Sequence, residues 1–96
     1  MTVVWYVKVR AKEGEEERVR DGLTRLAGPS RAVPGCLRFE VHQEADDPRT
    51  FSIYEQWADL AAHDVHVHSD HFRDIAQAEV TDRSEPLEVI ELDLLD

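Results

Sequence analysis

Four of the chain's five histidines lie within nine residues, in the stretch HDVHVHSDH at positions 63 to 71. Imidazole nitrogens bind transition metals, and they also accept and donate protons near neutral pH. The cluster therefore suggests one of two kinds of chemistry, a metal site or a site of proton transfer.

Helical geometry argues against the metal site. Successive residues advance about 100° around a helix, so His63 and His66 lie about 60° apart, whereas His68 and His71 project to other sides. No Cys, Asp or Glu at a recognised zinc spacing completes a ligand set. We therefore expect no functional metal and a role in proton transfer for only one or two of these histidines.

Four stretches of the sequence predict the strands that would hold such a site. They are rich in β-branched and aromatic residues, mostly in alternation, and comprise residues 2–11, 37–42, 51–57 and 87–95. Asp46-Asp47-Pro48 is a turn sequence that joins the middle two into a hairpin.

Two helices are predicted between these strands. The first follows Gly14 with three glutamates, which suit a helix N-terminus, and it ends between Gly28-Pro29 and Pro34-Gly35. Asp59 is placed to cap the second helix, and Ser69 to cap a restart within it.

The inward stripe predicted for the second helix consists of Ala62, Val65, Ser69, Phe72 and Ala76. The order of elements is β-α-β-β-α-β, which is that of an α+β, ferredoxin-like fold with an antiparallel sheet. We expect a single domain over residues 1–96.

Composition narrows the class of partner. Lys and Arg total 11 against 21 Asp and Glu, and the formal charge of −10 repels phosphate backbones and anionic lipid. We therefore expect no nucleic-acid partner and no membrane partner. The apolar N-terminal stretch is too short for a signal peptide, and the single cysteine, Cys36, cannot form an internal disulfide, so a cytoplasmic location is expected.

The first strand is apolar on both faces, as Val3-Val4-Trp5-Tyr6-Val7 illustrates. An antiparallel sheet covered by helices on one face is normally polar on the other. A second copy of the chain is the simplest cover for the second face, so the strand predicts a homodimer that packs sheet against sheet.

Two segments resemble the antibiotic biosynthesis monooxygenase (ABM) domain family. FSIYEQWADLAAHDVHVHSDHF is similar to the family's hallmark, and the residues that fall on it are Glu55, Trp57, His66, His71 and Phe72. SRAVPGCL is similar to the family's turn into the second strand, and the matching residues are Arg31, Pro34, Gly35 and Cys36.

This resemblance implies a dimeric α+β barrel with a ligand cavity between each sheet and its helices. It favours a cofactor-independent monooxygenase that oxidises a small planar phenolic, quinol or polyketide-like compound with O2. The alternative from another class is a non-catalytic, dimeric small-ligand-binding protein. Isomerisation and haem degradation rank below both; the family's haem-degrading members use an Asn on the first strand, and this chain contains no Asn.

The resemblance also nominates site residues. His66 and His71 are the candidate catalytic residues, because a cavity-facing histidine can accept a proton from a phenol or hydrogen-bond the resulting anion. His63 and His68 lie off the pattern and are expected to face solvent. The candidate substrate-binding residues are Trp57, Tyr54, Glu55, Arg31, Phe39, Phe51 and Phe72.

Structural roles remain open for several of these residues. Glu55 is expected to need a partner, with His66, His71 or Arg31 as the choices, and that pair could be purely structural. Trp57 could pack in the core, Arg31 could fasten the loop after the first helix, and Cys36 is expected to be a small buried hydrophobe.

Overall fold

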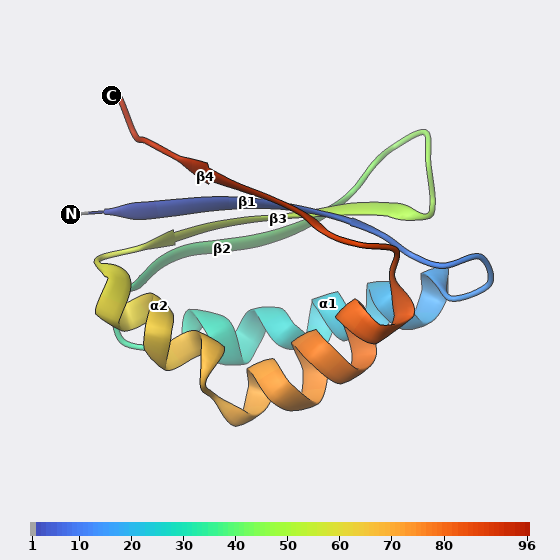
Figure 1. Cartoon of the computed structure of the whole chain (residues 1–96), viewed down its shortest axis with the longest axis horizontal. Helices are drawn as coiled ribbons and strands as arrows, with labels where there is room; N and C mark the ends of the chain where they lie inside the picture. The colour runs from blue at the N-terminus through green and yellow to red at the C-terminus, as the bar shows by residue number, and fades with distance from the viewer. Residues whose placement is uncertain (1) are drawn as a thin grey trace.

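One layer of helices covers one face of a four-stranded sheet in the computed structural model, which describes residues 2–96 (Figure 1). The elements follow in the order β1 (Val3–Arg10), α1 (Glu16–Arg31), β2 (Cys36–Gln43), β3 (Thr50–Trp57), α2 (Leu60–Val67), η1 (Phe72–Val80), η2 (Thr81–Arg83) and β4 (Glu88–Leu92). The sheet is antiparallel with the strand order β2-β3-β1-β4. The predicted ferredoxin-like α+β fold is confirmed.

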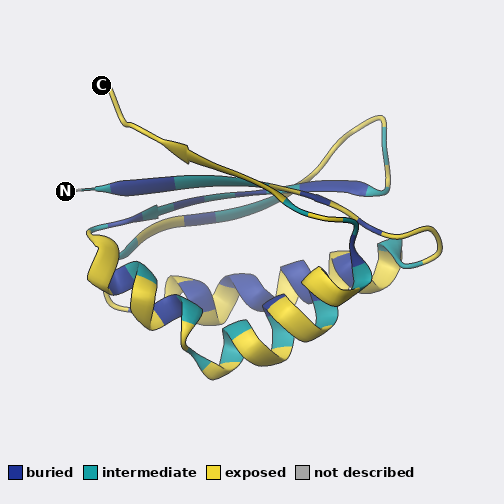
Figure 2. Cartoon of the chain, in the orientation of Figure 1, coloured by how far each residue is buried: buried dark blue, intermediate teal, exposed yellow. Residues whose placement is uncertain are grey.

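The register of the central strands decides which side chains face the helices. Trp5 of β1 lies opposite Glu55 of β3, and Val3 lies opposite Trp57. Because side chains alternate along a strand, these four residues share the helix-covered face, and the core forms there (Figure 2). The most deeply buried core residues, at most 2% exposed, include Val9, Val19, Leu23, Leu26, Phe39 and Trp57.

Two side-chain caps set the course of the chain after β3. The Asp59 carboxylate accepts a hydrogen bond from the backbone N–H of Ala62 at 2.8 Å, and α2 begins at this point. The helix stops at Val67. The Ser69 hydroxyl then accepts a hydrogen bond from the backbone N–H of Phe72, the first residue of the π-helix η1. Both predicted caps are confirmed, and the break between them brings His71 back toward the end of α2.

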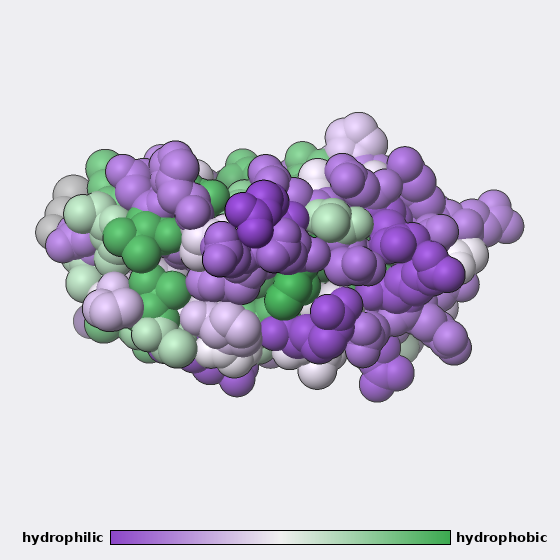
Figure 3. Space-filling view, turned by 90° about the horizontal axis from the view of Figure 1, so that it is seen from below, coloured by the Kyte–Doolittle hydropathy of each residue, from purple (hydrophilic) through white to green (hydrophobic). Residues whose placement is uncertain are grey.

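The inward stripe predicted for α2 is wrong at one position. Val65 is 58% exposed, whereas His66 is only 2% exposed. Ala62 and His66, four residues apart, form the inward face instead, and Val65 lies about 100° away from His66 around the helix. Seen from the helix side, the surface is mostly hydrophilic, with apolar atoms gathered at the end of the molecule that carries α2 (Figure 3).

The face of the sheet opposite the helices carries apolar residues from β1 and β4. Tyr6 lies opposite Ile90 and Val4 lies opposite Leu92, which places all four on this face. Ile90 is 48% exposed. No helix among residues 2–96 is both long enough and apolar enough to cross a membrane.

Replacing Gly35 with alanine should destabilise the protein much more than the same change at Gly14. Both glycines have a positive φ, of 90° and 86°, which costs a side-chain-bearing residue about 1–2 kcal/mol. A Cβ at Gly35 would also lie 2.6 Å from the Cβ of Ala62, whereas one at Gly14 meets nothing within 4 Å. We expect a loss of about 2–4 kcal/mol at Gly35 and about 1–2 kcal/mol at Gly14, measured by urea unfolding. Equal losses of stability would mean that the turn before β2 can move away from Ala62 of α2 at no cost in free energy.

Candidate active site

A cavity of about 230 Å³ lies between the sheet and the helices. This volume is just below the range of about 300–1,000 Å³ typical of small-molecule pockets, so it suits a small ligand. Every strand and every helical segment contributes to its walls, which include Trp5, Phe39, Ile53, Phe72, Ala76 and Val89. Ionisable groups interrupt this apolar lining at Glu55, His63 and His66.

Glu55 places a carboxylate on the cavity wall because it alternates with Tyr54 along β3. Its side chain is 7% exposed, and burying a carboxylate is costly unless it is paired. The indole N–H of Trp57 donates to its Oε1 at 2.9 Å, and Nε2 of His63 lies 3.5 Å from the same oxygen. The partners of Glu55 are thus Trp57 and His63 rather than the predicted His66, His71 or Arg31.

His63 faces the cavity, so the prediction that it faces solvent is wrong. Its side chain is 20% exposed and stacks on Trp5, with ring centroids 5.5 Å apart and an interplanar angle of 29°. Trp57 packs against the ring of His63 in an edge-to-face arrangement, with ring centroids 5.9 Å apart. His63 is one turn before His66 on α2, and both rings line the same cavity.

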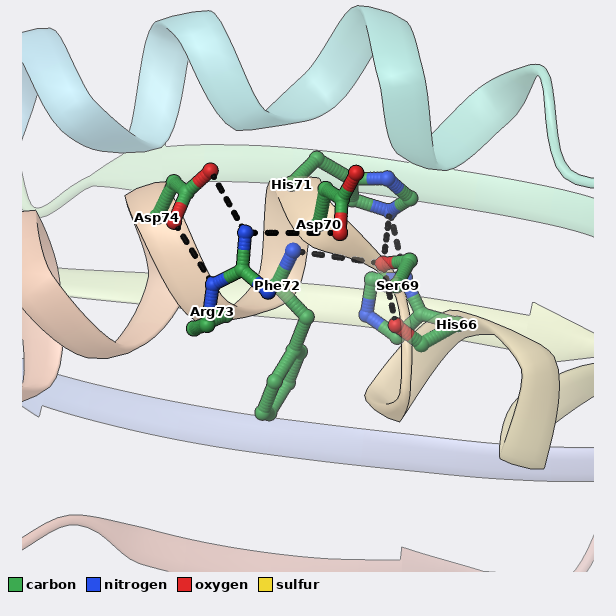
Figure 4. A network of polar contacts seen from close by, with 7 residues as sticks. All are labelled: His66, Ser69, Asp70, His71, Phe72, Arg73 and Asp74. Atoms are coloured by element: carbon green, nitrogen blue, oxygen red, sulfur yellow. Dashed lines mark hydrogen bonds and ion pairs between the residues drawn. The ribbon is translucent and has the colours of Figure 1, made fainter.

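His66 and His71 form a second polar group at the break between α2 and η1 (Figure 4). Nδ1 of His66 lies 3.1 Å from Nε2 of His71, and the same Nε2 lies 3.1 Å from the hydroxyl oxygen of Ser69. The Ser69 hydroxyl donates to the backbone carbonyl of His66. The ring of Phe72 packs edge-on against the ring of His66, with centroids 5.3 Å apart, and Phe72 lines the cavity.

These contacts assign the hydrogens on both rings. The single hydroxyl hydrogen of Ser69 goes to the carbonyl of His66, so the Ser69 oxygen can only accept from His71. Nε2 of His71 therefore carries a hydrogen and donates it toward both Ser69 and Nδ1 of His66. The neutral ring of His66 then carries its own hydrogen on Nε2, which has no hydrogen-bond partner among residues 2–96.

Burial keeps His66 neutral. Desolvation lowers its pKa from 6.5 to about 4; the Glu55 charge opposes this shift, and His71 and His63 reinforce it. The aromatic rings of Trp57, Phe39 and Phe72 surround it, with centroids 4.8, 5.7 and 5.3 Å from its own. Partial burial also lowers the pKa of His71, against the effect of Asp70.

The other nominated residues divide into those that line the cavity and those that do not. Glu55, His66, Phe39 and Phe72 line it. Trp57 is fully buried behind the wall, where it contacts His66. His71 is not part of the lining and acts on it only through His66.

Three nominated residues lie elsewhere. Tyr54 is on the opposite face of the sheet because it alternates with Glu55 along β3. Its ring lies under the Arg38 guanidinium, whose Cζ is 4.9 Å from the ring centroid. Arg31 donates to the backbone carbonyl of Phe39 at 2.9 Å and fastens the end of α1 to β2. Phe51 is buried outside the cavity lining. Cys36 is half-buried, and burial raises the pKa of its thiol.

Trp5 and His63 are the two nitrogen-bearing side chains of the cavity lining that sequence reasoning missed. Alternation along β1 already placed Trp5 on the same face as Val3, Val7 and Val9, which was the available signal. The indole nitrogen of Trp5 is buried and, in the described part of the chain, has no hydrogen-bond partner. Such a donor often marks a wall where a ligand or water completes the bond. Among residues 2–96, no three His, Cys, Asp or Glu side chains gather in a way that could hold a metal ion.

Comparison with known proteins gives matches along most of the chain. The family model described as antibiotic biosynthesis monooxygenase matches residues 2–78. The protein named "Putative monooxygenase YcnE", from Bacillus subtilis, is 28% identical over 89 residues, which cover 93% of this chain and 92% of that protein. An uncharacterized protein of Synechocystis is 26% identical over 61 residues, and the match spans 64% of this chain and 42% of that protein's length.

The fold has close relatives among solved structures. The crystal structure of PA3566 from Pseudomonas aeruginosa superposes with a TM-score of 0.89 at 28% sequence identity. The superposition covers 99% of this chain and 95% of that one. The likeness therefore includes the sheet, the helices and the space between them.

Proposed function

Because this chain belongs to the antibiotic biosynthesis monooxygenase family, we propose that it is a cofactor-independent monooxygenase acting with O2 on a small planar phenolic, quinol or polyketide-like compound. The observation that carries the proposal is His66, a neutral imidazole held rigidly in an aromatic-walled cavity. A family name alone does not fix a reaction, so the argument rests on what this cavity can do chemically.

The reaction that suits this cavity needs an anion and a dry pocket. Ground-state O2 is a triplet and reacts slowly with neutral closed-shell molecules, whereas an electron-rich phenolate or carbanion can transfer an electron to it. For a substrate with an activated CH2 group, one oxygen atom becomes the carbonyl oxygen and the other leaves as water. In our proposal, the Nε2–H group of His66 donates a hydrogen bond to the anion. His71 holds the ring of His66 in the tautomer that carries its hydrogen on Nε2.

Oxygen uptake tests this function directly. Purified, chelator-treated protein should accelerate O2 consumption with menadiol or an anthrone above the rate in buffer. No acceleration across a panel of phenols, quinols and anthrones would contradict the monooxygenase proposal. Ligand-dependent thermal stabilisation without turnover would instead favour the non-catalytic binding protein.

We also propose that two copies associate through the open face of the sheet. Its apolar residues, Tyr6, Ile90 and Leu92 among them, favour burial against an identical surface related by two-fold symmetry. The Ile90→Asp variant should sediment as a monomer at concentrations where the unchanged protein sediments as a dimer. Val65→Asp, on the helix side and at least as exposed as Ile90, is the matched control and should remain dimeric. An unchanged mass for Ile90→Asp would exclude this face.

A further inference from the structure

His63 has the position and partners of a proton acceptor, although it lies outside the family motif. We propose that His63, oriented by Glu55, takes the proton from the ligand's hydroxyl group, while His66 holds the anion that remains. This inference deepens the proposed function and depends on it in one respect, since it takes the ligand to be a phenol or a similarly acidic hydroxyl compound.

The first support is the orientation of the His63 ring. Nε2 faces Glu55 at 3.5 Å, and Trp57 fixes that carboxylate through a hydrogen bond to Oε1. A carboxylate on one ring nitrogen holds a histidine in the tautomer that leaves the other nitrogen free to accept a proton, and it stabilises the imidazolium that forms. The distance is long for a hydrogen bond, as catalytic contacts often are before a ligand binds. Nδ1 of His63 has no hydrogen-bond partner within the described residues, and the side chain lines the cavity.

The second support is that His66 is poorly suited to the same task. Its Nδ1 already accepts from His71, so the nitrogen left for the ligand carries a hydrogen. It is also almost fully buried, whereas His63 keeps 20% of its side chain exposed and would pay a smaller desolvation cost on becoming charged. The two rings, with centroids 6.1 Å apart, are close enough to contact one small ligand from adjacent positions.

The third support is the surroundings of the charge that proton transfer would create. His63 stacks on the indole of Trp5, and an aromatic face attracts a cation placed over it. Glu55 supplies the opposite charge at the other edge of the ring. Among residues 2–96, His66 has no ion-pair contact with a carboxylate, and its ring neighbours there are Trp57, Phe39, Phe72, His63 and His71.

The proposed step is a simple proton transfer. The ligand's O–H bond breaks, its electron pair remains on the ligand oxygen, and an N–H bond forms at Nδ1 of His63. The products are an imidazolium paired with Glu55 and a phenolate that accepts a hydrogen bond from Nε2 of His66. This step involves no oxidation or reduction, so it can be tested without O2.

Para-nitrophenol is a suitable probe, because its anion is yellow and it is not readily oxidised. In the absence of O2 and at a fixed pH near 7, the unchanged protein should raise the anion fraction of the bound probe above that of the free compound. His63→Gln and Glu55→Gln should each lower that fraction several-fold, while binding para-nitroanisole, which has no proton to give, as tightly as the unchanged protein does. His68→Gln, at the exposed histidine that follows the last residue of α2, is the matched control and should leave the anion fraction unchanged.

The outcomes separate this inference from the proposed function. If His63→Gln binds the probe with the anion fraction of the unchanged protein, His63 is not the acceptor, whatever the oxygen-uptake results show. If His63→Gln fails to fold, the Glu55→Gln result decides in its place, since the pair acts as a unit. If the unchanged protein binds neither compound, the phenolic ligand class itself is wrong.

Discussion

Replacing His66 with phenylalanine should lower kcat for oxygen uptake by about 10²- to 10³-fold, the effect of removing one hydrogen-bond donor to a developing anion. The aromatic cluster of Trp57, Phe39 and Phe72 can accommodate the new ring, so the fold should survive. Steady-state oxygen electrode measurements with the best substrate of the panel would give kcat and KM separately. We expect the loss mainly in kcat, because the anion exists only after substrate has bound.

The His68→Phe variant controls for the added aromatic ring, since His68 lies at the exposed end of α2. It should keep the kcat of the unchanged protein. A His66→Phe enzyme that turns over at the normal rate would show that the anion is held elsewhere in the cavity, and it would remove the main support for the proposed function.

Mild acid should destabilise the protein through His66 by about 2–3 kcal/mol between pH 7 and pH 4.5. The pKa of this histidine is about 4 in the folded protein and 6.5 without the fold's influence. Between these values the unfolded chain binds more protons than the folded one, so the free energy of unfolding decreases as the pH falls. The contribution is fully present above pH 6.5 and is lost as the pH approaches 4.

Urea unfolding at the two pH values would measure this effect. The unchanged protein contains other groups that titrate in this range, among them His71, whose pKa burial also lowers. The His66→Phe variant retains those groups, so the difference between the two proteins isolates His66. We expect the variant to lose about 2–3 kcal/mol less than the unchanged protein on acidification. Parallel losses would mean that His66 is as accessible to protons in the folded state as in the unfolded one.

The architecture was accessible from sequence because it depends on local patterns. Alternation identified the strands, and Asp59 and Ser69 are short-range caps whose partners lie three residues away. Alternation also placed Glu55 and Phe39 on the inner face of the sheet. The same rule places Tyr54 on the outer face, so nominating Tyr54 as a cavity donor conflicted with a pattern already visible in the sequence.

The arrangement of the histidines was not accessible in the same way. Which of them face inward depends on how α2 docks against the sheet and on the angle at which the chain continues after Ser69, and neither can be derived from local sequence patterns. The family motif includes His66 and His71 but not His63, whose partner Glu55 is eight positions earlier in the sequence. The contact between Arg31 and the carbonyl of Phe39 likewise depends on how α1 docks against β2.

The edge strand β4 alternates between two surfaces of different purpose. Val89 belongs to the wall of the cavity, while Ile90, the next residue, belongs to the open face on which a second copy would pack. A displacement of this strand would therefore change both surfaces at once. If ligand and partner each favour the same position of β4, thermodynamic linkage requires that each strengthen the binding of the other by an equal factor. Ligand affinity would then rise with protein concentration. Through this one edge strand, the fraction of cavities that hold ligand would depend on the fraction of the protein that is dimeric.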